Sequence, residues 1–201
     1  DFITANKDLL KADVVVISDS PMFDRDVPSI CYGLRGLAYF QIDVRGTKSD
    51  LHSGSFGGAV VNPAMALATA IAAMKDKGGR IKIPGFYDDV VALKDEERAE
   101  FAKLPFNEKR YRMDLGAPKL FGETGYTTLE RVWARPTFEV NGLLSGFTGD
   151  GAKTVLPAVA MAKVSMRLVP NQDPKKIGDL FEAWVKKVTP NSMIHLTEKP
   201  V

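Results

Sequence analysis

The sequence predicts an α+β fold in which helices cover one face of a small antiparallel sheet. Two segments, 37–44 and 159–169, alternate apolar and polar residues as half-buried strands do. Two others begin with an Asn-Pro or Asp-Pro pair and continue with apolar residues at helical spacing. The 201 residues are enough for one domain with a buried core, or for one domain plus part of another.

Composition excludes several classes of protein. A chain that is 45% hydrophobic and 26% charged is an ordinary globular sequence, not a disordered, collagen-like or coiled-coil one. The net charge of only +2 argues against a dedicated nucleic-acid or anionic-membrane binder. One cysteine cannot form an internal disulfide, and two histidines cannot build a three-histidine metal site. The first residue is Asp1 rather than Met, so we expect a processed chain or an excised segment.

The N-terminal segment predicts a strand of a different kind. Residues 14–17 form a continuous β-branched run, which is typical of a strand buried on both faces in a parallel sheet. The run ends in a polar segment that contains Asp19. We therefore expect residues 1–34 to be the trailing fragment of an α/β domain.

A strand, a loop and a helix are predicted next. Residues 37–44 predict a strand, and residues 46–58 a loop. A helix is expected to begin at the Asn62 cap with Pro63 in its first turn, and to stop at Gly78 and Gly79.

A long insert is expected at about 80–128, with a short charged helix over 95–104 and many glycines and prolines. A strand is predicted over 129–140, with Pro136 arguing against a fully paired central position. A glycine-rich turn is then predicted over 142–151.

The last part of the chain predicts a strand, a helix and a strand. Residues 159–169 alternate cleanly, Asp173 and Pro174 begin a helix that ends before Pro190, and residues 193–197 form a last strand. From residue 35 onward the order is β-α-insert-β-β-α-β. This is the ferredoxin-like order, with a four-stranded antiparallel sheet and both helices on one face.

Two candidate site residues lie in irregular segments. Asp19 follows the end of a predicted buried strand, where metal-binding carboxylates collect; the alternative is a turn or cap aspartate. His52 lies in a loop between a strand and a helix. It suits acid–base chemistry, metal binding or oxyanion stabilisation; the alternative is a solvated loop histidine.

Other candidates lie on or near the strand at 159–169. The guanidinium of Arg167 could hold a carboxylate with two parallel hydrogen bonds, unless it is an ordinary exposed arginine. Thr154 follows the glycine-rich turn and could bind substrate, although turn threonines are common. We interpret His195 as structural and Cys31 as a buried or half-buried thiol without activating neighbours.

Four segments carry a combined motif: 15–19, 33–36, 50–54, and 151–157 with its continuation at 165–170. Taken together, they resemble metallopeptidase family M20, and within it the branch of carnosinase-type dipeptidases. Residues of the insert, at 83–87 and 122–126, also resemble that branch. The resemblance covers essentially the whole chain.

The resemblance implies a lid or dimerisation domain, residues 35–201, attached to a piece of the catalytic domain of a two-metal, usually zinc, hydrolase. Asp19 would be a terminal metal ligand. His52 would enter an active site, that of the partner subunit in dimeric members, and polarise the scissile carbonyl. Thr154 would hydrogen-bond the substrate, and Arg167 would bind its C-terminal carboxylate.

We therefore expect the lid of a cytoplasmic enzyme that hydrolyses short peptides. The full protein would hold two zinc ions, with manganese or cobalt as alternatives. It would form a homodimer through the helix after His52 and an exposed sheet edge, with no nucleic-acid or membrane partner. Because the other metal ligands and the general base are expected outside residues 1–201, the isolated chain should be inactive and bind no metal tightly.

Two alternatives from other classes stay open. The chain could be a stand-alone ferredoxin-like interaction or regulatory module without hydrolase activity. Residues 35–40 also resemble, weakly, the RNA-recognition ribonucleoprotein signature, but on the first strand rather than the third.

Overall fold

A computed structural model describes residues 1–17, 19, 21–189 and 193–198. The chain divides into two compact units, Asp1–Leu34 and Arg35–Val201. In the described ranges no helix is both long and apolar enough to cross a membrane.

The first unit holds little regular structure. Helix α1 (Phe2–Ala5) begins at Asp1, and Asp24 forms an isolated bridge with Val27. The strand predicted over 14–17 is wrong: these four residues form no ladder, and their side chains are 75% to 84% exposed. A strand buried on both faces needs neighbours, and no described residue pairs with this segment. Cys31 is likewise exposed, not buried as expected.

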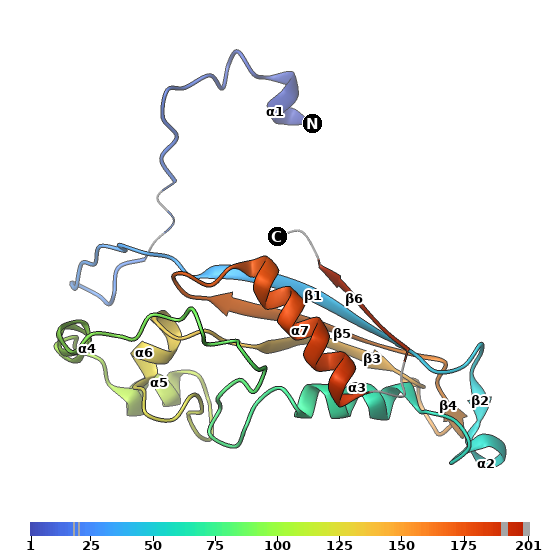
Figure 1. The fold of residues 1–201 in the computed structure, drawn as a ribbon. Helices are drawn as coiled ribbons and strands as arrows, with labels where there is room; N and C mark the ends of the chain where they lie inside the picture. The colour runs from blue at the N-terminus through green and yellow to red at the C-terminus, as the bar shows by residue number, and fades with distance from the viewer. Residues whose placement is uncertain (18, 20, 190–192, 199–201) are drawn as a thin grey trace. The chain divides into compact units, whose positions relative to one another are not determined.

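The second unit contains the predicted four-stranded sheet (Figure 1). Its strands are β1 (Gly36–Arg45), β3 (Glu139–Ser145), β5 (Val159–Leu168) and β6 (Met193–Glu198). The spatial order is β3-β5-β1-β6, with every neighbouring pair antiparallel. The ferredoxin-like prediction is confirmed, since the first and third strands of the motif occupy the centre of the sheet.

Two helices cover one face of this sheet, α3 (Pro63–Ala72) over β5 and β1, and α7 (Pro174–Val188) over β1 and β6. The alternation predicted for both central strands is confirmed, because every second residue faces the helices and is buried. Phe40 of β1 and Phe181 of α7 pack with ring centroids 5.5 Å apart.

The opposite face of the sheet is more open. On this face the β1 residues from Leu37 to Asp43 are half-buried, whereas Lys163 and Arg167 of β5 are exposed. His195 of β6 lies opposite Asp43 on this face and is exposed, so it is not packed into the core.

Both predicted helix starts are confirmed. The Asn62 side chain accepts a hydrogen bond from the Ala64 amide at 2.9 Å, and that of Asp173 accepts one from the Lys176 amide at 3.0 Å. Helix α3 ends at Ala72, before the glycines expected to stop it. The chain has already turned back there, since the Lys82 amide donates to the Met74 carbonyl at 2.7 Å.

The insert is more helical than predicted. It contains the expected charged helix as α4 (Asp95–Ala102), and in addition α5 (Glu108–Asp114). The strand predicted over 129–140 is wrong in its first half, where α6 (Thr128–Trp133) forms. A capping box between Thr127 and Glu130 starts this helix and outweighs the β-branched residues.

Strand β3 also extends past the point where a turn was predicted. It continues through Gly142 with a register shift between Val140 and Gly142, and the turn begins only at Gly146, whose φ is 71°.

Candidate functional site

One candidate site lies on a small arm beyond the end of the main sheet (Figure 1). Strands β2 (Leu51–His52) and β4 (Val155–Leu156) pair there, and α2 (Ser53–Phe56) follows β2. The segment predicted as a loop over 46–58 therefore contains two short elements. Backbone pairing continues from the Ser53 amide to the Thr154 carbonyl at 2.9 Å.

The arm brings together two predicted site residues that lie 102 positions apart in the sequence. The His52 Nε2 and the Thr154 Oγ1 are 2.9 Å apart. The Gly54 amide donates to the His52 Nδ1 at 3.1 Å. Because Nδ1 accepts a hydrogen bond, the neutral ring carries its proton on Nε2, and Nε2 donates to the threonine hydroxyl. The exposed imidazole thus presents an N–H group.

Gly54 allows this ring position. A Cβ atom at residue 54 would lie 2.9 Å from the His52 Cε1 and 3.1 Å from the Nδ1. Any side chain there would force the imidazole away from the amide that orients it. The ring orientation thus depends on Gly54 as well as on Thr154.

Arg167 lies at the opposite end of the sheet. On β5 it pairs with Leu37, whereas Val159 at the start of β5 pairs with Arg45 near the arm. Eight residues separate Arg167 from Val159, a distance of about 26 Å at roughly 3.3 Å per residue. The structure therefore brings His52 and Thr154 together but keeps Arg167 far from both.

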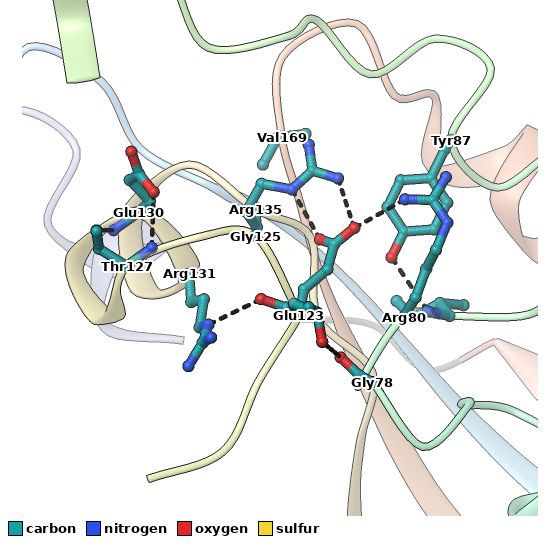
Figure 2. Close-up of polar contacts among 12 residues, drawn as sticks. Gly78, Arg80, Tyr87, Glu123, Gly125, Thr127, Glu130, Arg131, Arg135 and Val169 are labelled. Carbon is teal, nitrogen blue, oxygen red and sulfur yellow. Dashed lines mark hydrogen bonds and ion pairs between the residues drawn. The ribbon is translucent and has the colours of Figure 1, made fainter.

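Buried ion pairs lie close to the Arg167 end of the sheet, and Figure 2 shows Glu123 between Arg135 and Arg80. The Glu123 carboxylate accepts two hydrogen bonds from Arg135, at 2.8 and 2.9 Å, and one from Arg80 at 2.8 Å. Glu123 and Arg135 are 7% and 4% exposed. Burial alone would lower the pKa of Arg135, but the bonds and charge of Glu123 outweigh it and raise that pKa. Tyr87 stacks against both guanidiniums.

A second buried carboxylate, in α6, has its own partners. Glu130 accepts from Arg98 Nε at 2.7 Å and from the Thr127 amide at 2.7 Å. Burial would raise the pKa of Glu130, but the backbone bond from Thr127 and the bonds and charge of Arg98 lower it below its ordinary value. Sequence reasoning missed these buried acids, and only the Thr-x-x-Glu capping pattern could have indicated one of them.

Asp19 belongs to the first unit, where it is exposed. Within the described ranges, no group of three or more His, Cys, Asp or Glu side chains is placed to hold a metal ion. A lone carboxylate does not form a metal centre, so the described residues do not fit a metal site by themselves.

Comparison with known proteins identifies the family. Residues 32–193 match the family model described as the peptidase dimerisation domain. The chain belongs to metallopeptidase family M20. This dimerisation domain contains both the arm with His52 and the strand with Arg167.

Among curated relatives, this chain is similar to a Cys-Gly metallodipeptidase of Schizosaccharomyces pombe, with 36% identity over 92% of this chain and 39% of the relative. It is 32% identical to the human Beta-Ala-His dipeptidase over 90% of this chain and 37% of the relative. The chain thus spans about two fifths of the length of these relatives.

Solved structures of M20 family proteins are also similar to this chain. The M20 family metallo-carboxypeptidase Sso-CP2 of Sulfolobus solfataricus superimposes with a TM-score of 0.78 and 36% identity, over 97% of this chain and 51% of that one. Human carnosine dipeptidase 1 gives a TM-score of 0.74 and 28% identity, over 81% and 36%. Both likenesses support the ferredoxin-like assignment.

Proposed function

We propose that residues 35–201 are the lid and dimerisation domain of a two-metal peptidase that hydrolyses short peptides, and that residues 1–34 are part of its catalytic domain. The metal centre would hold two zinc ions, with manganese or cobalt as alternatives, and this chain would contribute only Asp19 to it. A cytoplasmic location is part of the same proposal. Relatives named as a Cys-Gly metallodipeptidase and a Beta-Ala-His dipeptidase support the substrate class.

The observation that carries the proposal is the distance between the two ends of β5. A dipeptide spans about 7 Å when fully extended. Arg167 and His52 are separated by more than about 26 Å along the sheet, so they cannot contact the same short peptide. In a homodimer, one chain would give Arg167 to one active site, and His52 with Thr154 to the other.

Each residue type suits its role. The Nε2–H of His52 can donate to the oxygen of the scissile carbonyl, where negative charge develops. If the His52 ring turns from Thr154 to the carbonyl oxygen, the Thr154 hydroxyl becomes free to hydrogen-bond the substrate. Arg167 offers a planar fork for the C-terminal carboxylate.

Two surfaces with exposed apolar side chains could form the homodimer. The outward face of α3 carries exposed Met65, Ala68, Thr69 and Ala72 at helical spacing. Strand β3 is an edge of the main sheet, and its Leu143 is 62% exposed. We expect a second copy to cover both surfaces, since exposed apolar patches and unpaired edges favour association.

Subunit complementation tests this proposal in the full-length protein. His52→Ala and Arg167→Ala should each reduce dipeptide hydrolysis by about 100-fold or more. Mixing the two variants under conditions of subunit exchange should restore roughly a quarter of wild-type activity, because half of the molecules are mixed dimers and each has one intact site.

No restoration after demonstrated exchange would contradict the placement of these residues in two active sites. A full-length protein without any metal-dependent peptidase activity would favour the stand-alone interaction module instead.

A further inference from the structure

A second arginine lies at the Arg167 end of the sheet. Gly36 pairs with Leu168 and Leu37 with Arg167, so Arg35 enters β1 one step beyond the paired residues, opposite Val169. Residues 35 and 37 share one face of an extended segment. Arg35 is thus a diagonal cross-strand neighbour of Arg167 on the open face.

The hydrogen bond of Arg35 fixes the course of its side chain. Its Nη1 donates to the carbonyl oxygen of Arg135 at 3.3 Å. Arg135 precedes β3, and the nearby Thr137 amide donates to the Arg167 carbonyl at 3.0 Å. The Arg35 side chain therefore reaches across the chain near Val169, just past the end of β5, the strand that carries Arg167.

Neither guanidinium has a counter-charge among the described residues. No salt bridge joins Arg35 or Arg167 to a carboxylate in the described part of the chain, although Arg80, Arg98 and Arg135 each have one. Burial and the charge of Arg167 lower the pKa of Arg35. A half-buried cation bound only to a carbonyl, beside another cation, creates a strongly positive position.

The Arg35 guanidinium is also held in place by an ordered partner. The Arg135 side chain is fixed by two bonds to the buried Glu123, and this fixes the backbone carbonyl that Arg35 contacts. One of the five N–H groups of Arg35 is used by that carbonyl, which leaves donors for a ligand. A site ordered before binding costs less entropy when the ligand arrives.

We propose that Arg35 and Arg167 together form the binding site for the C-terminal carboxylate of the peptide, with Arg35 as a second recognition residue. A carboxylate between two guanidiniums replaces their repulsion by charge-assisted hydrogen bonds to both of its oxygens. This proposal rests on the proposed function. It adds that the enzyme selects peptides by two arginines contributed from neighbouring strands.

The test compares hydrolysis of Cys-Gly with that of Cys-Gly amide by the full-length protein. Arg35→Gln should raise KM for Cys-Gly about tenfold or more and change the amide reaction little, because only the acid places a charge at the site. Arg35→Lys should recover part of the loss, since it keeps the charge without the fork. Lys163→Gln, which removes an exposed cation from the same face of β5, should change neither reaction.

Several outcomes would overturn the proposal. An equal loss with both substrates, together with a lower urea midpoint of unfolding, would make Arg35 a structural residue. A change of substrate preference in Arg167→Gln but not in Arg35→Gln would assign the carboxylate to Arg167 alone. If the wild-type protein cleaves neither substrate with any of its proposed metals, the proposed function fails and this proposal fails with it.

Discussion

The two ends of the sheet are built in different ways. At the Arg167 end, the insert surrounds buried carboxylates with arginines, and Glu123 alone accepts three charge-assisted hydrogen bonds. At the His52 end, a two-residue ladder and a few exposed hydrogen bonds hold the imidazole. We call the Arg167 end, with Glu123, Arg135 and their partners, the platform. The His52 end is the projecting arm formed by β2, α2 and β4.

This difference matches the tasks proposed for the two ends. A group that recognises a substrate carboxylate binds best when it is ordered in advance. A group that must enter the active site of another subunit benefits from an arm that can adjust. Burial of apolar and ionic groups concentrates stability at the first end, and low burial leaves the second end easier to open.

The largest expected effect comes from the buried ion pair. Glu123→Ala leaves Arg135 buried without a counter-charge and should reduce the free energy of unfolding by about 3–5 kcal/mol. Glu139→Ala, which breaks the exposed 3.0 Å pair with Lys75, is the control and should cost no more than about 1 kcal/mol. Urea unfolding measures both. An equal decrease in the free energy of unfolding for both variants would mean that the buried Glu123–Arg135 pair stabilises the protein no more than an exposed pair does.

A smaller, pH-dependent effect is expected from Glu130. The pKa of its folded state lies below that of the unfolded chain, so its contribution is fully present above the unfolded value of about 4.3 and is lost as the pH falls through the folded pKa. Glu130→Gln should therefore flatten the acid limb of a plot of unfolding free energy against pH. Glu100→Gln, on an exposed helix face, should leave that limb unchanged. Parallel acid limbs for wild type and Glu130→Gln would contradict this assignment.

The smallest effect is local and concerns the arm. Asp50 accepts a hydrogen bond from the Ala158 amide at 2.8 Å, and Asp50→Ala should weaken the arm by about 1 kcal/mol. Hydrogen exchange of the Ser53 amide should then accelerate about fivefold, while the Thr137 amide, bonded to the Arg167 carbonyl, should not change. Asp43→Ala, on the open face of β1, serves as the control. Acceleration at both ends would show that the arm and the platform open together.

Local sequence patterns predicted the sheet and its two main helices, because strand alternation and helix caps depend on residues close in the chain. The run at 14–17 failed because its burial depends on partner strands rather than on its own composition. The helix at Thr128–Trp133 was missed because a capping box outweighed β-branched residues. Two-residue strands such as β2 carry too few residues to show a period.

The sequence predicted the individual residues of the candidate site but not which of them lie together. A resemblance singled out His52, Thr154 and Arg167, but their grouping depends on the pairing of β2 with β4 and on the register of β1 with β5. Glu123 and Arg135 lie 12 residues apart with no local signal that they would be buried together. Such pairs form only through the tertiary fold, so local sequence patterns do not predict them.

The amide of Gly54 also decides which nitrogen of His52 is free to act in the role proposed for it. Imidazole binds a metal through a nitrogen lone pair, and in His52 that lone pair, on Nδ1, is already engaged by a backbone N–H. The other nitrogen carries a proton and points to Thr154. In the role proposed for His52, the ring therefore offers a donor N–H to the substrate, while its lone pair is occupied by the Gly54 amide.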